Sequence, residues 1–265
     1  MAIRALIRGV PDSFVHALSA APREGASAQI DVRLARAQHA AYRAALEACG
    51  AIVTELSADE RFPDCVFVED TAVGAGGPGA GSAGGRLALI TRPGAPARRG
   101  EIEAVAVELA CHLELARIEE PATLDGGDCM WLGQTLYIGR SARTNAAGIA
   151  RAEAALAPRG YRIVPVELPP GVLHLKCVCS PLGDGRVLLA EGTLPAALFP
   201  AGVVWVPAEE RYAANAVAVG EHVIAAAEYP RTLAALAAAG LRVHPVPTSE
   251  VRKADGSLTC QSLLF

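Results

Sequence analysis

The chain ends on the stretch Asp255-Gly256-Ser257-Leu258-Thr259-Cys260-Gln261-Ser262-Leu263-Leu264-Phe265. A polar, glycine-containing turn leads here into a last short apolar segment, which is typical of a closing β-strand. We expect this strand to pair with a first strand near Ile3, so that the chain closes on itself. Cys260 lies at the mouth of the strand, where it is a candidate nucleophile. A free cysteine is more often a small buried hydrophobic residue, so other residues must support that interpretation.

Pairs of short β-rich segments recur upstream of this end, and glycine-containing links between paired segments are typical of β-hairpins. The predicted strand pairs cover residues 66–68 with 87–90, 128–132 with 135–138, 173–179 with 186–190, and 216–219 with 222–224. Alanine-rich amphipathic helices are predicted over 31–49, 99–115, 144–157 and 230–239, the third with Thr144 as a candidate N-cap. Counting the closing strand, five weak repeats favour an α/β fold with closed radial symmetry over a doubly wound sheet.

The composition limits the classes of function. The 265 residues are 52% hydrophobic and 20% charged, which is ample for one large core. A net charge of -4 without a basic run argues against nucleic-acid binding. The first residues are too charged for a secretory signal, and no apolar stretch approaches the ~20 residues that span a bilayer. We therefore expect one catalytic domain over residues 1–265, in the cytoplasm and without a membrane partner.

The cysteines agree with a reducing compartment. There are seven, an odd number, and no Cys-x-x-Cys pair occurs, so a zinc ribbon or a thioredoxin site is not indicated. Cys177 and Cys179 are two residues apart and would share one face of a strand. We interpret them as buried thiols.

Polar residues fall at corresponding places in the five repeats. They are Asp64, Glu69 and Asp70 in the first hairpin, Asp125 and Asp128 before the second, His174 in the third, Asn215 in the fourth and Cys260 in the fifth. Equivalent ends converge on one axis in a closed radial fold, so these side chains would share a pocket. Cysteine attacks as thiolate, histidine transfers protons, and a carboxylate can orient the histidine. Surplus carboxylates suit a cationic substrate such as a guanidinium, whose charge would in turn favour the thiolate.

Taken one at a time, these residues also have structural interpretations. His174 between leucines would by itself be a hydrogen-bonded structural histidine, and Glu69-Asp70 or Asp125-Gly126-Gly127-Asp128 would be turns. Arg92 and Arg143 would by default be surface residues. The glycine-rich stretch 74–85 lacks Gly-Lys-Ser/Thr and joins two predicted strands, so we interpret it as a hairpin loop rather than a phosphate cradle.

Five segments together resemble a known family. They are residues 61–70 (RFPDCVFVED), 123–128 (TLDGGD), 139–145 (GRSARTN), 173–176 (LHLK) and 255–260 (DGSLTC). In this order they resemble the dimethylarginine dimethylaminohydrolase family of the guanidine-modifying, pentein-type superfamily. The resemblance runs from the first strand to the last residue.

This resemblance implies a five-bladed α/β propeller with pseudo-fivefold symmetry around a central substrate channel. It implies hydrolysis of asymmetric dimethylarginine or monomethylarginine to citrulline and a methylamine through a covalent thiouronium on Cys260. His174 would protonate the leaving amine and then activate water, and Asp125 would orient His174. The substrate-binding residues that it implies are Leu18 in a lid, Asp64 for the α-amine, Glu69 and Asp70 for the guanidinium, Arg92 and Arg143 for the α-carboxylate, and the carbonyl of Ala254.

No cofactor and no dedicated metal site are implied, although zinc could inhibit by meeting Cys260 and His174. Exposed blade edges could pair in a homodimer. Three alternatives remain open at this point: an arginine deiminase, an amidinotransferase of the same superfamily, and an inactive binding protein. The first two usually carry a longer chain, and the complete Cys-His-carboxylate set argues against the third.

Overall fold

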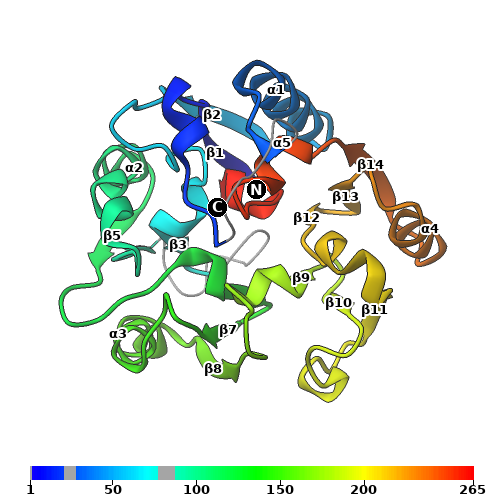
Figure 1. The fold of residues 1–265 in the computed structure, drawn as a ribbon. Helices are drawn as coiled ribbons and strands as arrows, with labels where there is room; N and C mark the ends of the chain where they lie inside the picture. Colours follow the sequence, from blue (N-terminus) through cyan, green and yellow to red (C-terminus); the bar gives the residue numbers. More distant parts are fainter. Residues whose placement is uncertain (1, 21–27, 77–86) are drawn as a thin grey trace.

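Five three-stranded sheets surround a common axis in the computed structural model, which describes residues 2–20, 28–76 and 87–265 (Figure 1). In each sheet a central strand pairs antiparallel with an inner strand and parallel with an outer strand. The predicted five-bladed α/β propeller is therefore confirmed. We number the sheets as blades one to five, in the chain order of their central strands.

The strands of each blade are given from inner to outer. Blade one is β15 (Ser262–Leu264), β1 (Arg4–Arg8) and β2 (Ile52–Leu56); blade two is β3 (Ala72–Gly74), β4 (Leu87–Ile90) and β5 (Glu114–Arg117). Blade three is β6 (Cys129–Leu132), β7 (Thr135–Arg140) and β8 (Arg162–Glu167). Blade four is β9 (Cys179–Pro181), β10 (Val187–Ala190) and β11 (Val203–Val206); blade five is β12 (Val217–Val219), β13 (His222–Ala226) and β14 (Arg242–Val246).

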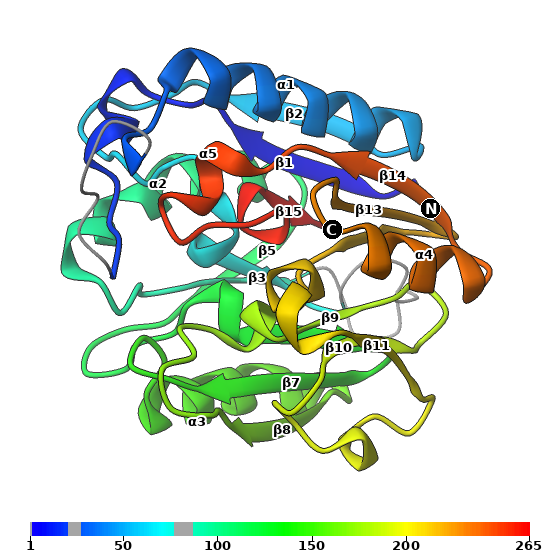
Figure 2. The ribbon, with the colours of Figure 1, turned by 45° about the vertical axis from the view of Figure 1, so that its right-hand side comes forward.

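Helices lie on the outside of the ring and connect central to outer strands (Figure 1). They are α1 (Val32–Ala48), α2 (Ile102–Ala110), α3 (Ala146–Leu156) and α4 (Pro230–Ala238). Blade four has only a 3-10 turn, η9 (Ala196–Leu198), in this place, where each of the other four blades has a helix. The short α5 (Ser249–Arg252) packs against α1 (Figure 2).

The chain closes on itself through its two ends, as predicted. β15 runs antiparallel to β1 with Ala5 opposite Leu264. Arg4 and Phe265 exchange two backbone hydrogen bonds, of 2.8 and 2.9 Å. The ring is thus sealed by a strand pair, which removes two strand edges.

A 3-10 turn precedes every inner strand, and in blades two, three and four it takes up residues that the sequence predicts as strand. These turns are η3 (Val68–Thr71), η6 (Gly126–Asp128), η8 (Leu175–Cys177), η10 (Ala208–Ala214) and η11 (Thr259–Gln261). Residues 66–68 and 173–178 therefore do not form the predicted strands: both runs lie mostly buried in turns, and the inner strands begin only at Ala72 and Cys179. Cys260 likewise lies in η11, just before the closing strand.

Two smaller differences concern helix and strand assignment. Asn145, not Thr144, caps α3, since its side chain accepts the N–H of Gly148. Sequence reasoning also missed the outer strands, which are short and half exposed and carry no clear alternation. The central strands β4 and β10 are buried throughout and read as continuous apolar runs.

Of the glycine-rich stretch 74–85, residues 77–85 lie outside the described residues. Within the part of the chain that is described, no helix combines the length and the apolar character that a membrane crossing requires.

Candidate active site

The turns before the inner strands bring Asp70, Cys260 and the neighbours of His174 to one place in the fold. A cleft of about 990 Å³ opens there. Seven residues predicted for the site line it: Leu18, Asp64, Asp70, Arg143, His174, Ala254 and Cys260. Because η3, η8 and η11 belong to different blades, only ring closure places Asp70, His174 and Cys260 together.

His174 is anchored by Asp125. Its Nε2 lies 3.1 Å from Asp125 Oδ2, and both side chains are buried. The second oxygen, Asp125 Oδ1, accepts the Gly94 N–H at 2.7 Å. Asp125 is thus held from its far side and can fix the orientation of the imidazole.

The glycine at 127 is required by the close approach of two side chains. A Cβ there would lie 2.7 Å from His174 Nδ1 and 2.9 Å from Asp70 Oδ1. Its N–H also donates to Asp70 Oδ1 at 2.9 Å. Gly127 is therefore required for more than the turn, because only glycine leaves room there for the imidazole and the carboxylate.

Three carboxylates make the imidazole basic. Burial lowers the pKa of His174, but the charge of Asp70, the hydrogen bond that His174 donates to Asp125 and the charge of Asp128 outweigh it and raise that pKa to about 9. His174 is therefore protonated at neutral pH. It is prepared to act as a general acid.

Asp70 is held as a carboxylate beside this imidazolium. Burial raises its pKa, but His174, Arg98 and the Gly127 N–H together lower that pKa to about 2. Arg98 lines the cleft, is buried, and pairs with both Asp70 and Glu101. Sequence reasoning missed Arg98, since nothing in its local sequence distinguishes it from neighbouring Arg99.

Cys260 is partly exposed at the floor of the same cleft. Burial first, and then the charges of Glu69 and Asp70, raise the pKa of its thiol well above the ordinary value. This environment therefore favours the protonated thiol. A cation bound beside Asp70 would reverse this bias by offsetting the negative charge.

Asn215 fixes the turn that carries Cys260. Its Oδ1 accepts the Thr259 N–H at 2.9 Å, and its Nδ2 donates to Thr259 Oγ1 at 2.9 Å and to the carbonyl of Lys176 at 2.8 Å. Asn215 is buried between the turns of blades four, five and one. Its part in the repeat pattern is positional: it connects the Cys260 turn to the turn that follows His174.

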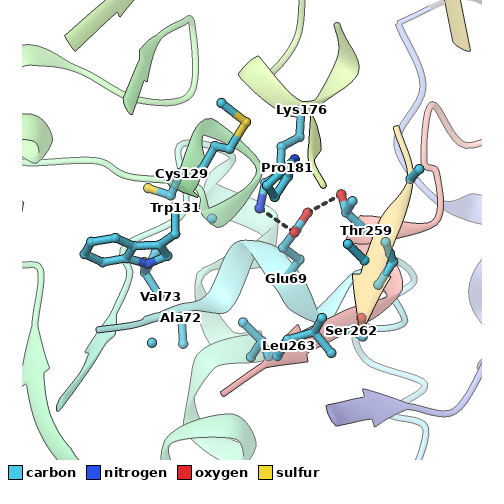
Figure 3. Close-up of a pocket in the computed structure, with 17 residues that line it drawn as sticks. Glu69, Ala72, Val73, Cys129, Trp131, Lys176, Pro181, Thr259, Ser262 and Leu263 are labelled. Carbon is cyan, nitrogen blue, oxygen red and sulfur yellow. Dashed lines mark hydrogen bonds and ion pairs between the residues drawn. The ribbon is translucent and has the colours of Figure 1, made fainter. Parts of the chain in front are cut away.

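Glu69 faces a different cavity from the one predicted. Its carboxylate forms an ion pair with Lys176 and accepts the Thr259 hydroxyl at 2.7 Å (Figure 3). All three residues line a cavity of about 110 Å³ formed along the inner strands, with Trp131 in its wall. Of the predicted guanidinium-binding pair, only Asp70 lines the cleft, because Lys176 draws Glu69 to the other side.

Arg92 is also turned away from the cleft. Its guanidinium lies 3.3 Å from a Glu120 carboxylate oxygen and donates to the Ala122 carbonyl at 3.4 Å. The predicted contact of Arg92 with a substrate carboxylate is therefore not supported by its position. Arg143 does line the cleft, and Arg140, Arg211 and Arg252 add further positive charge around its wall.

The remaining predicted residues form the rim. Asp64 is buried, and its two oxygens accept the Leu18 N–H at 3.0 and 3.3 Å. Leu18 itself is 40% exposed at the cleft, as a lid side chain would be. Cys177, expected as a buried strand thiol, instead lies in η8 and lines the cleft, whereas Cys179 is buried.

The ligand atoms of Asp70, Asp125 and His174 lie within 4.8 Å of one another. Asp70 already pairs with Arg98 and accepts the Gly127 N–H. Asp125 already accepts the Gly94 N–H and lies in hydrogen-bond contact with His174. These groups are thus arranged to stabilise an imidazolium.

Comparisons with known proteins show which proteins resemble this chain. No protein-family model matches the chain. A curated protein of Pseudomonas aeruginosa, N(G),N(G)-dimethylarginine dimethylaminohydrolase, is 42% identical over 238 residues, which cover 89% of this chain and 90% of that protein. A solved dimethylarginine dimethylaminohydrolase adduct with S-methyl-L-thiocitrulline is 39% identical with a TM-score of 0.90 and covers 100% of both chains. A variant of the Pseudomonas aeruginosa protein complexed with citrulline is 38% identical with a TM-score of 0.89, again over 100% of both chains.

Proposed function

Because this chain belongs to the dimethylarginine dimethylaminohydrolase family, we propose that it hydrolyses asymmetric dimethylarginine or monomethylarginine to citrulline. The other product is dimethylamine or methylamine. The observation that carries the proposal is the meeting of Cys260, His174 and Asp70 in one cleft. Their charges suit a reaction in which a cation binds before the nucleophile ionises.

Substrate binding prepares the nucleophile. The guanidinium pairs with Asp70 and adds positive charge beside Cys260, which lowers the pKa of the thiol, so that the thiol releases its proton to solvent. Asp64 accepts hydrogen bonds from the α-amine, and Arg143 pairs with the α-carboxylate. Leu18 covers the bound amino acid, and the Ala254 carbonyl contacts it.

The chemistry then takes two steps. Cys260 sulfur forms a bond to the guanidinium carbon, and the bond from that carbon to the methylated nitrogen breaks as His174 donates a proton to the leaving amine. A thiouronium remains on Cys260. His174, now neutral, takes a proton from water as the water oxygen attacks the same carbon. The carbon–sulfur bond then breaks, and the remaining hydroxyl proton passes to the departing Cys260 sulfur, which gives citrulline and the free thiol.

The test is a substrate comparison on purified protein. Citrulline formation is measured separately with asymmetric dimethylarginine, monomethylarginine and arginine, together with the amine that is released. We expect the methylated substrates to have the higher kcat/KM; arginine as the clearly better substrate would indicate an arginine deiminase. Transfer of the amidino group to an added amine, without citrulline, would indicate an amidinotransferase.

Two cysteine variants test the nucleophile. Cys260→Ser should lower kcat at least ~10³-fold while substrate binding persists. Cys177→Ser is the matched control, since Cys177 lines the same cleft and has no proposed role. Full activity in Cys260→Ser would exclude Cys260 as the nucleophile.

We also propose that residues 1–265 form one catalytic domain that works in the cytoplasm. All seven cysteines are free, which is usual in a reducing compartment. We further propose that the protein forms a homodimer. Trp205, which is 43% exposed on the outer strand β11, is the side chain that we expect at the contact. Sedimentation of wild type and Trp205→Ser would test this contact.

A further inference from the structure

A cysteine and two histidines meet far from the cleft, where blade five joins α1. Cys49 is the C-cap residue of α1, His222 begins β13, and His244 lies in β14. The parallel register sets His222 opposite Arg242 and Ile224 opposite His244. His222 and His244 therefore project from the same face of neighbouring strands, since side chains alternate along a strand.

The three ligand atoms are close together. His222 Nδ1 lies 2.8 Å from His244 Nε2, and the ring centroids are 5.0 Å apart. One donor atom from each of Cys49, His222 and His244 lies within 4.8 Å of the others. Thiolate and imidazole are the preferred ligands of zinc and of similar borderline divalent cations.

The required rearrangement is small. Two imidazole nitrogens that bind one tetrahedral zinc at ~2.05 Å are about 3.3 Å apart, so the histidine pair needs to open by only about 0.5 Å. Both histidines are partly exposed. Cys49 is 8% exposed and faces the same point.

Solvent reaches this point. Cys49 and His222 line a cavity of about 350 Å³, together with Ala2, Ile3 and Glu221. None of its lining residues lines the cleft with Cys260. The cavity leaves room for water as a fourth ligand.

We propose that Cys49, His222 and His244 form a second site, which binds a zinc-type divalent cation. As the metal–sulfur bond forms, the Cys49 thiol releases its proton to solvent. The hydrogen bond between the histidines breaks, and the ring nitrogen that carried its proton passes it, through solvent, to the other nitrogen of the same ring, so that His222 Nδ1 and His244 Nε2 each donate a lone pair to the metal. Burial raises the pKa of Cys49 to about 11, so the metal itself supplies the bias toward thiolate.

Such a site would tie the end of α1 to blade five. α1 belongs to blade one, whose closing strand pair seals the ring. The cation would therefore stabilise the seam between the first and last blades. This inference does not depend on the proposed hydrolase function.

The test uses Cys260→Ser protein, which lacks the thiol of the cleft and whose metal binding is measured without turnover. Zn²⁺ is titrated by calorimetry, and Co²⁺ is added to record the sulfur-to-cobalt charge-transfer band. We expect one bound ion per chain, the band, and a higher Tm with metal. Cys49→Ser and His244→Gln, each in this background, should lose the band and most of the affinity.

Cys111→Ser is the matched control, since Cys111 is an exposed free cysteine outside both sites. The Tm of each variant without metal shows whether it folds, and His222→Gln, at the partly exposed ligand, serves if Cys49→Ser does not. Unchanged Co²⁺ spectra in the folded ligand variants, or no ion bound by the Cys260→Ser parent, would overturn the site.

Discussion

At the residue scale, the charge of His174 is decided by its neighbours. An imidazole buried alone would be neutral, but Asp70, Asp125 and Asp128 surround this one and raise its pKa to about 9. Burial, together with the charges of Glu69 and Asp70, raises the pKa of the Cys260 thiol and keeps it protonated as well. His174 and Cys260 are thus both protonated before a cation binds.

The raised pKa of His174 links stability to pH. A group whose pKa rises from 6.5 to about 9 on folding stabilises the protein fully below about pH 6.5, and this stabilisation is lost as the pH rises through about 9. The unfolding free energy of wild type should therefore exceed that of His174→Asn by an amount that shrinks between pH 6 and 10. Urea unfolding over this range measures it, with His112→Asn, at a partly exposed histidine, as the control. A constant difference would contradict the assigned charge.

At the element scale, the 3-10 turns before the inner strands carry the chemistry. η3, η6 and η8 place Asp70, the Gly126-Gly127 pair and the residues next to His174 within contact of one another. Hydrogen bonds between turns, rather than strand pairing, set these positions, as in the bond from Gly127 to Asp70. The strands serve as the rigid supports behind the turns.

Gly127→Ala tests this packing. A Cβ at 127 would press on His174 Nδ1 and Asp70 Oδ1, so the imidazole must move. We expect kcat to fall more than ~10-fold, with a loss of about 1–3 kcal/mol in stability. Steady-state kinetics and urea unfolding measure both. Gly133→Asn is the control, since Gly133 has φ of +56° in open space and asparagine tolerates that conformation; equal kinetics in the two variants would refute the steric argument.

At the scale of the whole molecule, a buried ion pair on the axis joins separate blades. Glu69 precedes the inner strand of blade two, Lys176 precedes that of blade four, and Thr259 precedes the closing strand. The pair separates the cavity along the inner strands from the reactive cleft. Because the ion pair links blades two and four, which are not consecutive in the chain, its loss should destabilise the whole ring.

Lys176→Met should destabilise the protein by ~3–5 kcal/mol near neutral pH, because Glu69 is left buried without its partner. Burial raises the pKa of Glu69, so the loss should shrink as the pH falls and the carboxyl takes up a proton. The double variant Lys176→Met/Glu69→Gln should recover most of the stability. Arg117→Met, which breaks the exposed pair with Glu103, is the control and should cost under about 1 kcal/mol. No recovery in the double variant would show that the pair is not the cause.

Local sequence patterns predicted much of the fold and several of the site residues. Glycine links between apolar runs predicted the hairpins around 129–140 and 217–226, and the apolar end predicted the closing strand. Cys260, His174 and the aspartates could be singled out because chemistry-bearing residues recur at one place in each repeat. These signals are readable because they depend on neighbours in sequence.

Only the tertiary structure decided where each side chain points. Glu69 and Asp70 are adjacent in sequence, yet Lys176 draws one to the inner-strand cavity while Arg98 and His174 hold the other in the cleft. Arg92 turns to Glu120, and Arg98, with no local signal, takes a place beside the reactive groups. The partners that choose these directions lie on distant blades, and charge pairing across a closed ring cannot be derived from spacing along the chain.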